Sequence, residues 1–404
     1  MPKPVVLVGA LDTKGAEFQF VRELLQAQGL ETILVDFGVL GDPPVTPDIG
    51  SDEVARAGGS SLAALRRQGD KTLAMRTMAA GLTRVVTELY EAGRLGGILG
   101  MAGSGGTAIA TAAMRALPTG VPKLMVSTVA AGDIAPYVGT KDITMMPSVV
   151  DVAGINRFSR QIYTNAAGAI AGMVRMEAPA VTEDKPLITA SMFGNTTPCV
   201  NHAKALLEAR GYEVLVFHAT GTGGKTMESL IEAGYITANL DITTTELADE
   251  VCGGVLSAGP DRLMAAARRG IPTVLVPGCV DMANFWARDT VPERYRQRLL
   301  YEWNPNVTLM RTNVAENRRI GEMIAAAANA STGPVAILIP LKGVSQLDSP
   351  GGPFWDPEAD AACYEAIKAH LRPGIPVIEM DNNINDPAFA EKAVEVLLAM
   401  LARQ

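Results

Sequence analysis

Two glycine-rich loops are the segments of this chain best suited to chemistry. Residues 101–107 read Met-Ala-Gly-Ser-Gly-Gly-Thr, and residues 219–226 read Ala-Thr-Gly-Thr-Gly-Gly-Lys-Thr. Each loop directly follows a short apolar run, as expected of a turn between a strand and a helix. Glycine permits a left-handed backbone and a close approach of a ligand, and the following helix directs the positive end of its dipole at negative charge. Both loops are therefore candidate phosphate sites.

The first loop has three glycines and two hydroxyls at a predicted strand-to-helix junction. This is more than one capping residue requires, so the pattern favours anion binding. The alternative is a tight turn in which Ser104 or Thr107 caps the helix.

The second loop is one residue short of the P-loop pattern G-x-x-x-x-G-K-[ST], because Ala219 stands at the first position. No strand ending in a magnesium-holding aspartate of the Walker type accompanies it, which argues against a true P-loop. Its N–H groups could still hold a substrate or another anion, together with polar residues at later strand ends. The residues predicted to bind substrate or anion are Gly221, Thr222, Gly223, Gly224, Lys225, Ser257, Asn284 and Ser345.

Polar residues also follow the first two predicted strands. Asp12, Thr13 and Lys14 lie at a predicted helix start, where they could contact phosphate or Mg²⁺ or simply cap the helix. Asp36 ends the second strand, where dinucleotide-binding folds hold ribose hydroxyls, but the fingerprint G-x-G-x-x-G is absent. This favours another nucleotide over NAD. The predicted cofactor-binding residues are Gly9, Asp12, Thr13, Lys14, Asp36, Gly103, Ser104, Gly105, Gly106, Thr107 and Asp133.

Carboxylates gather at predicted strand ends in the second half of the chain. They are too numerous to be caps alone, which indicates acid/base catalysis or metal coordination by oxygen ligands, with the metal undefined. His218 is the one histidine at a predicted strand end. The predicted catalytic residues are Asp281, His218, Lys342 and Asp348.

The four cysteines have neither metal-binding nor disulfide spacing. Cys279 lies at a predicted strand end and could be a nucleophile, but a packed and inert thiol is the favoured interpretation.

Short, continuous apolar runs alternate with amphipathic stretches, which predicts parallel sheets covered on both faces. We therefore expect an α/β protein with two Rossmann-like, doubly wound domains. The pattern lapses between two prolines at 179 and 186, so the nucleotide-binding domain is placed at 1–180 and a substrate or anion domain at 186–404. One helix is predicted over 52–67. The predicted strands are 4–9, 32–37, 97–100, 123–127, 143–146, 187–191, 213–217, 237–240, 273–276, 308–311, 335–339 and 377–380.

Composition narrows the class of protein. The 404 residues carry a net charge of −8, with no basic cluster, which argues against nucleic acid as a partner. No apolar run is long enough to span a bilayer and the N-terminus lacks a signal peptide, so no membrane partner and a cytoplasmic location are predicted.

Five segments together resemble a known family: residues 8–15, 103–107, 142–157, 217–224 and 350–354. They are similar to the ATP-binding domain family of the tomato tobamovirus-resistance protein and its bacterial relatives, over essentially the whole chain. The resemblance implies two Rossmann-like domains, bound ATP and a tendency to dimerise. It also weakens the P-loop interpretation of Lys225, because the family has no fixed Lys-Thr ending in this loop.

The leading hypothesis is an ATP- and Mg²⁺-dependent enzyme that acts on a small metabolite in a cleft between the domains, by phosphoryl transfer or ligation. A homodimer or higher homo-oligomer is expected. The alternatives are a non-catalytic ATP-binding interaction protein, and a lyase or hydrolase that uses the carboxylates of the second half without nucleotide. An NAD-dependent dehydrogenase is disfavoured by the missing fingerprint.

Overall fold

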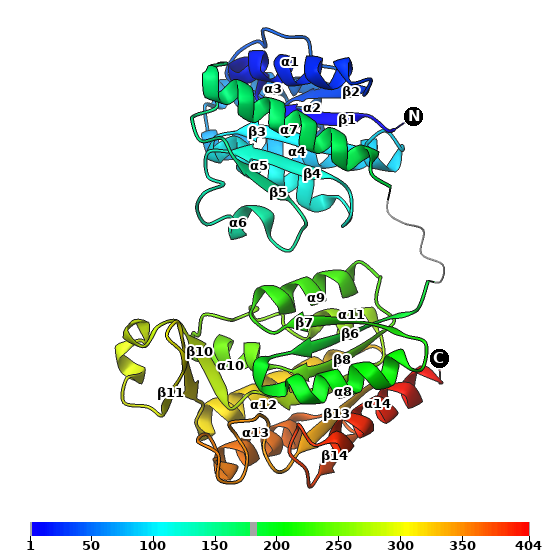
Figure 1. Cartoon of the computed structure of the whole chain (residues 1–404), viewed down its shortest axis with the longest axis vertical. Coiled ribbons are helices and arrows are strands. Elements are labelled where there is room, and N and C mark those ends of the chain that lie inside the picture. Colours follow the sequence, from blue (N-terminus) through cyan, green and yellow to red (C-terminus); the bar gives the residue numbers. More distant parts are fainter. Residues whose placement is uncertain (1, 178–183, 404) are drawn as a thin grey trace. The chain divides into compact units, whose positions relative to one another are not determined.

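The computed structural model describes residues 2–177 and 184–403. The chain forms two compact units, Met1–Ala180 and Val181–Gln404, each with its own central sheet (Figure 1). Both are layered α/β structures with mostly parallel sheets, so the predicted fold class of two Rossmann-like units is confirmed.

A parallel five-stranded sheet in the order β2-β1-β3-β4-β5 forms the centre of the first unit. Its strands are β1 (Val5–Gly9), β2 (Thr32–Asp36), β3 (Gly97–Ala102), β4 (Lys123–Ser127) and β5 (Thr144–Pro147). β1 is paired on both sides, with Leu7 opposite Leu34 of β2 and Leu99 of β3. The direction of the strand order therefore reverses at β1, and ligands of open α/β sheets bind beyond the carboxyl ends of strands at such a point.

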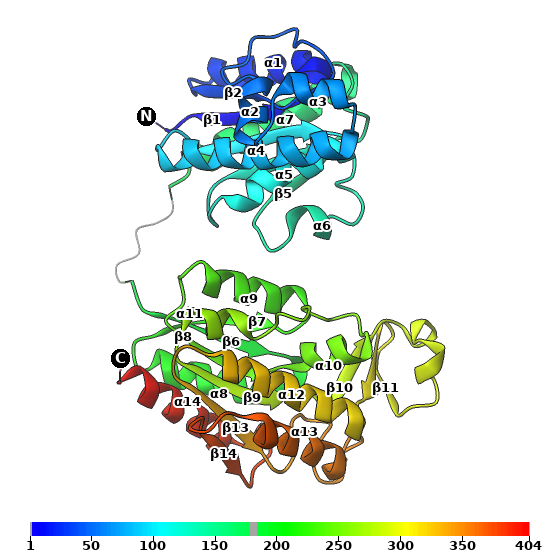
Figure 2. The same ribbon diagram turned by 180° about the vertical axis from the view of Figure 1, so that it is seen from behind.

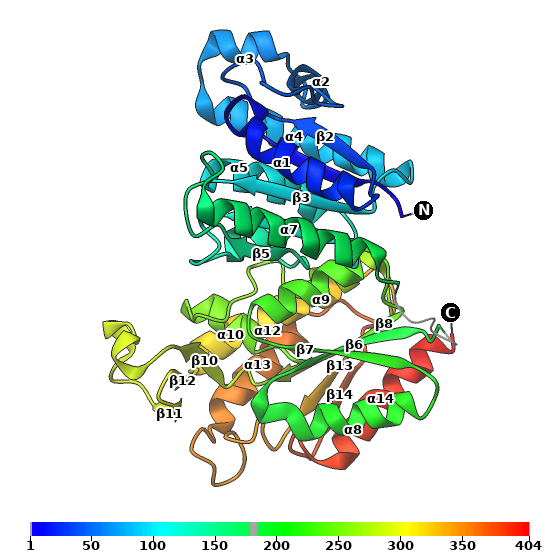
Figure 3. The ribbon, with the colours of Figure 1, turned by 45° about the horizontal axis from the view of Figure 1, so that its top comes forward.

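Helices cover both faces of this sheet. They are α1 (Leu11–Ala27), α2 (Ser51–Ala57), α3 (Leu62–Gln68), α4 (Lys71–Glu91), α5 (Ser104–Ala116), α6 (Ala135–Val138) and α7 (Arg157–Arg175). Alternate side chains of β1 point to opposite faces. Val6 and Val8 pack with residues of α2, α4 and α5 on one face of the sheet. Val5 and Leu7 pack with residues of α1 and α7 on the other face, and Figure 3 shows these two helices on the same side of the sheet.

The second unit is built around a parallel six-stranded sheet in the order β14-β13-β9-β8-β6-β7. Its strands are β6 (Leu187–Met192), β7 (Glu213–His218), β8 (Ala238–Thr243), β9 (Thr273–Gly278), β13 (Val335–Pro340) and β14 (Val377–Met380). Its helices are α8 (Thr197–Glu208), α9 (Thr222–Glu232), α10 (Thr245–Cys252), α11 (Met264–Arg269), α12 (Val314–Ala330), α13 (Pro357–His370) and α14 (Pro387–Leu401). Side chains of α8 and α14 pack on one face, and those of α10, α12 and α13 pack on the other.

A small antiparallel sheet projects from one end of the second unit (Figure 2). It consists of β10 (Met282–Phe285), β12 (Val307–Arg311) and β11 (Leu300–Asn304), in that order. We call residues 282–311 the arm. The prediction that 308–311 belongs to the parallel sheet is wrong, and β10 and β11 were not predicted. β10 is a buried strand of only four residues that begins four residues after β9 ends, so it is too short and too close to β9 to stand out in the sequence. Four of the five residues of β11 are exposed, so β11 has no buried-strand pattern.

The helix predicted over 52–67 is divided into α2 and α3. Gly58 ends α2 and Gly59 has a φ of +88°, a left-handed conformation that a helix cannot contain. Among the described residues, no helix is both long and apolar enough to cross a membrane.

Candidate functional site

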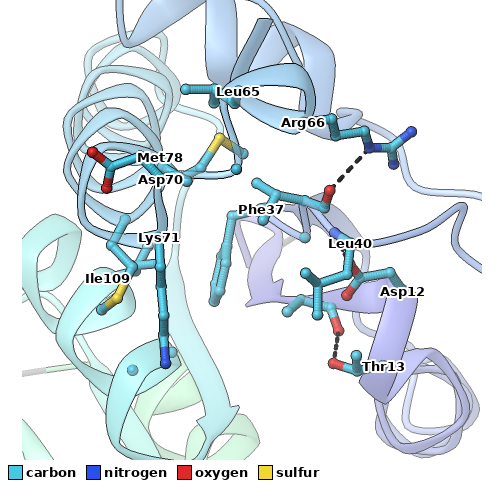
Figure 4. Close-up of a pocket in the computed structure, with 18 residues that line it drawn as sticks. Asp12, Thr13, Phe37, Leu40, Leu65, Arg66, Asp70, Lys71, Met78 and Ile109 are labelled. Atoms are coloured by element: carbon cyan, nitrogen blue, oxygen red, sulfur yellow. Dashed lines mark hydrogen bonds between the residues drawn. The ribbon is translucent and has the colours of Figure 1, made fainter. Parts of the chain in front are cut away.

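A pocket of about 670 Å³ opens in the first unit beyond the carboxyl ends of β1, β2 and β3 (Figure 4). This is the edge of the sheet where the strand order reverses. The loops after β1 and β2 form one wall, and α3, α4 and the start of α5 form the other. Its size and position are those of a small-molecule site.

Most of the pocket wall is apolar. The side chain of Phe37 stands near its centre, and aliphatic and thioether groups surround it (Figure 4). The main apolar residues are Phe37, Leu40, Leu65, Met75, Met78 and Ile109. Such a surface accommodates a flat, apolar group like a nucleobase.

The first turn of α5 supplies unsatisfied backbone donors to this pocket. Gly103 is the N-cap, and it has no side chain to bond the N–H groups that follow. Gly105 and Gly106 line the pocket. Gly106 must be glycine, because a Cβ atom there would lie 2.7 Å from the Cβ of Ala102. The positive end of the α5 dipole is thus directed at the pocket.

Lys71, the first residue of α4, brings a cation to the same space. Its neighbour Asp70 caps α4 by accepting a hydrogen bond from Leu73 N at 3.0 Å. Figure 4 shows the Lys71 side chain extending into the pocket, across from Asp12 and Thr13. Lys71 is exposed, and it forms no ion pair among the residues that the structure describes.

Arg66 has a structural function, because it connects the two walls of the pocket through hydrogen bonds. Its guanidinium donates to the carbonyl oxygens of Val39 at 2.9 Å and Gly41 at 2.7 Å, which ties α3 to the loop after β2. Lys71 is therefore the side chain available to an anionic ligand.

The two aspartates predicted near the nucleotide have separate tasks. Asp36 is 1% exposed and accepts hydrogen bonds from Leu11 N at 2.9 Å and Gly38 N at 2.8 Å. Burial raises the pKa of Asp36 although these bonds oppose the shift. These hydrogen bonds hold the Asp36 carboxylate between the segments that follow β1 and β2, and Asp36 does not line the pocket. Asp12 does face it: one oxygen accepts from Leu40 N at 2.7 Å and Gly41 N at 3.2 Å, and the other has no partner among the described residues.

Four of the eleven predicted cofactor residues line the pocket, namely Asp12, Thr13, Gly105 and Gly106. The others lie outside it. Gly9 is packed against the ring of Phe18, Lys14 donates to Val152 O, and Asp133 accepts from Ala135 N. Thr107 is buried and bonds the hydroxyl of Ser127 at 2.6 Å. The remaining three are Asp36, Gly103 and Ser104.

The second glycine loop already holds an anion that belongs to the chain. Oε1 of Glu246 accepts hydrogen bonds from Gly221 N at 2.7 Å and Gly224 N at 3.0 Å. A Cβ atom on Gly224 would lie 2.2 Å from the other carboxylate oxygen. Glu246 thus takes the position where we expected an external phosphate or substrate anion. Lys225 and Thr222 of the same loop are exposed.

Arg262 completes this arrangement as a buried cation among three carboxylates. It donates to Glu246 at 2.6 Å, to both oxygens of Asp241 at 2.6 and 2.7 Å, and to Glu228 at 3.2 Å. The side chains of Arg262, Asp241 and Glu246 are fully buried. The second loop is therefore a structural element that fastens α9, β8 and α10 together.

Three of the polar residues predicted in the second half come together, but out of reach of solvent. Ser345 donates to Asp281 at 2.9 Å and accepts from Asp348 N at 3.0 Å, and all three residues are fully buried. Lys342 instead pairs with Asp381 at 2.8 Å on the surface. The ring of His218 lies against that of Phe193, with the two planes tilted by 38° and the ring centroids 5.4 Å apart.

The other predicted residues of this half serve the local structure. Asn284 donates to Asp249 at 2.6 Å, and Ser257 accepts from Gly259 N at 2.9 Å. Cys279 is buried, and burial raises the pKa of its thiol well above the usual value, which disfavours a nucleophilic thiolate. Among the described residues, no group of three or more histidine, cysteine, aspartate or glutamate side chains could hold a metal ion.

Sequence reasoning missed the apolar wall and Lys71. Phe37, Met75 and Ile109 have the spacing of core residues, and nothing in the sequence separates a side chain that lines a pocket from one that fills a core. The Asp70-Lys71 pair was a usable signal, because a cap followed by lysine places a cation at the start of a helix beside the sheet edge.

Comparison with known proteins identifies relatives across the whole chain. The descriptions "Uncharacterised protein family (UPF0261) N-terminal domain" and "C-terminal domain" match residues 3–179 and 185–401. A UPF0261 protein of Clostridium tetani is 50% identical over 404 residues, 100% of each chain. The ToMV resistance protein Tm-1(GCR237) of Solanum lycopersicum is 42% identical over 333 residues, which are 81% of this chain and 44% of that protein. The resemblance to the tomato protein and its bacterial relatives is confirmed, and ATP binding stays a prediction.

A likeness to solved structures is much weaker. UDP-N-acetylglucosamine 2-epimerase from Rickettsia bellii has a TM-score of 0.24 at 10% identity, with 100% of this chain and 98% of that chain covered. A score this low carries no argument about function.

Proposed function

The chain belongs to the UPF0261 family, and from that premise we propose that the pocket of its first unit binds ATP. The observation that carries the proposal is the pairing, in one cavity, of an apolar wall with an uncapped helix N-terminus and a lysine. A nucleotide has two parts that complement these features: a flat base that fits the apolar wall, and a chain of anionic phosphates that fits the helix N-terminus and the lysine.

The phosphates would lie at the α5 end of the pocket. N–H groups of the first helical turn bind phosphate oxygens without further help, and the ammonium of Lys71 adds a charge-assisted bond. The base would lie among Phe37, Met75 and Met78. Asp12 lines the pocket and would supply the carboxylate that ribose hydroxyls or a phosphate-bound Mg²⁺ needs.

The reaction that we predicted, phosphoryl transfer to a small metabolite or ATP-dependent ligation, belongs to this proposal. One observation favours the second candidate, a non-catalytic ATP-binding protein. The predicted acid/base residues of the second unit are either buried, as Asp281 and Asp348 are, or paired elsewhere, as Lys342 is. The same observation weighs against a lyase or hydrolase that uses those carboxylates without nucleotide.

Replacing Lys71 by alanine is expected to weaken ATP binding about tenfold or more, because a hydrogen bond to a charged group contributes about 1.5–3 kcal/mol. Isothermal titration calorimetry with ATP and Mg²⁺ measures this. Arg76→Ala is the matched control, since Arg76 is an exposed cation on the same helix that does not line the pocket.

Wild-type protein without affinity for ATP, ADP or AMP would overturn the nucleotide proposal. Equal affinities of the Lys71→Ala and Arg76→Ala variants for ATP would show that Lys71 does not bind the phosphates. Release of ADP in the presence of a metabolite panel separates the enzyme from the non-catalytic binding protein.

A homodimer in the cytoplasm completes the proposal. The support for association is β11, an edge strand on which Tyr301 and Trp303 are 38% and 43% exposed. We expect light scattering to give twice the 42.5 kDa of one chain. A mass of 42.5 kDa at high protein concentration would contradict a dimer.

A further inference from the structure

The central sheet of the second unit also reverses its strand order. β6 pairs with β7 on one side and with β8 on the other, as β1 does with β2 and β3 in the first unit. Ligands of open α/β sheets bind beyond the carboxyl ends of the strands at such a point. The arm lies at this end of the sheet, toward which β6 and β7 run in Figure 1. The turn after β6, residues 193–195, therefore has the position of a ligand site.

Aromatic rings from three separate elements meet at this turn. The ring of Phe193 lies against that of His218, the last residue of β7, with the centroids 5.4 Å apart. A Cβ atom on Gly194 would lie 3.6 Å from Cζ2 of Trp303 in β11, so the indole stands beside this glycine. Phe193 also packs against an apolar cluster that includes Leu309 of β12, which holds the arm beside the turn. The three rings are thus fixed relative to one another by the fold.

These rings are open to solvent. His218 is exposed, Trp303 is 43% exposed, and Phe193 and Gly194 are half-buried. Gly194 has no side chain to cover the neighbouring indole, although a Cβ atom there would make only an ordinary contact. The turn therefore presents an aromatic surface with free space beside Trp303.

Polar groups border the rings. Gln346, in the loop after β13, donates its backbone N–H to Asn195 O at 3.2 Å and is exposed. The imidazole of His218 and the amide of Gln346 can each both donate and accept hydrogen bonds. Residues 193–195, His218, Trp303 and Gln346 include no lysine, arginine, aspartate or glutamate. The surface is therefore suited to a ligand without charge.

We propose that Phe193, Gly194, His218, Trp303 and Gln346 form a second small-molecule site, which binds a neutral hydroxylated ring such as a monosaccharide. The aromatic rings pack against the C–H face of the ligand. Its hydroxyl groups both donate and accept, which matches the imidazole and the amide. A few polar groups beside an apolar surface are the usual means of orienting a small ligand.

This sugar site is independent of the nucleotide proposal, because it belongs to the second unit and contains no anion-binding group. It gives a role to His218, a predicted catalytic residue, as a group that contacts the ligand. It is also compatible with a dimer formed through β11. Pairing between copies would use the backbone edge of that strand, whereas side chains such as Trp303 stand roughly perpendicular to the sheet.

Tryptophan fluorescence of the full chain without nucleotide tests the sugar site. The probes are D-glucose, D-galactose, D-ribose and myo-inositol, each titrated to about 50 mM, because enzymes have KM values of about 1 mM or less for small substrates. We expect at least one probe to shift the emission to shorter wavelength in a saturable manner, since a bound ring would cover the half-exposed indole of Trp303.

Two pairs of variants make the test specific. Gly194→Leu should abolish the shift, because the leucine fills the space beside the indole without a clash at Cβ. Gly168→Leu, at an exposed glycine of α7 where a Cβ atom meets nothing within 4 Å, should retain it. Trp303→Phe should remove the shift, whereas Trp286→Phe, which changes the 52% exposed tryptophan of the same arm, should not. If Gly194→Leu does not fold, His218→Ala replaces it and should weaken binding.

The absence of a saturable shift with all four probes would overturn the sugar site. A full shift in Gly194→Leu, or one that Trp303→Phe retains, would equally contradict it. Emission that changes with protein concentration and not with any sugar would assign the Trp303 indole to a contact between copies, and the proposal would then be wrong.

Discussion

Arg262→Met is expected to destabilise the second unit by about 3–5 kcal/mol, the largest stability effect that we predict. The side chain is fully buried and binds Asp241, Glu246 and Glu228. Methionine fills similar space but leaves these carboxylates without a cation. Burial already raises the pKa of Glu228 despite the charge of Arg262, so removing the guanidinium can only increase the cost of ionising this group.

Urea unfolding followed by tryptophan fluorescence measures this loss, because Trp286, Trp303 and Trp355 all belong to the second unit. The midpoint of the second unit should fall. Arg268→Met is the matched control: Arg268 forms an ion pair with Glu232 in which the side chains are 50% and 43% exposed, and such pairs contribute about 1 kcal/mol or less. Equal midpoints for the two variants would mean that the buried network does not stabilise the unit.

The parallel sheets could be predicted because their strands are buried on both faces. Runs such as Val5–Gly9 and Val335–Pro340 are continuous and apolar, a pattern that covered parallel strands share. The arm could not be predicted in the same way. β11 is mostly exposed, and β12 is held by pairing with β10 and β11 and by the contact of Arg311 with Asp360, 49 residues later in the chain. Apolar periodicity contains no information about such a contact.

The two glycine loops show where local sequence stops being informative about a site. Both have one glycine at the N-cap of a helix and two in its first turn, and both place backbone N–H groups there. What separates them is Glu246, a partner 22 and 25 residues away from the two glycines that it bonds. The first loop has no such side chain at its N-cap, and it opens on a pocket whose apolar wall could not be distinguished from core in the sequence.

Gly105→Asp is expected to abolish most ATP binding while leaving the first unit as stable as before, or more so. A Cβ atom on Gly105 would lie 3.6 Å from the Cε of Met75, an ordinary contact, so the change fits the fold. A carboxylate in the first turn of a helix stabilises the helix by about 0.3–1 kcal/mol. The same charge would stand where the phosphates are proposed to bind, and we expect the Kd for ATP to rise about 100-fold, equivalent to about 2.7 kcal/mol.

A matched control separates the effect on binding from any effect on folding. Gly50 is the N-cap of α2 and does not line the pocket, and a Cβ atom there would meet no other atom within 4 Å. Gly50→Asp adds the same charge to another helix start of the first unit, so calorimetry should show wild-type affinity for ATP. Unchanged affinity of Gly105→Asp for ATP would show that the phosphates do not bind at the start of α5. Because a carboxylate favours a helix start but repels a phosphate, only a ligand at α5 predicts higher stability together with lost binding.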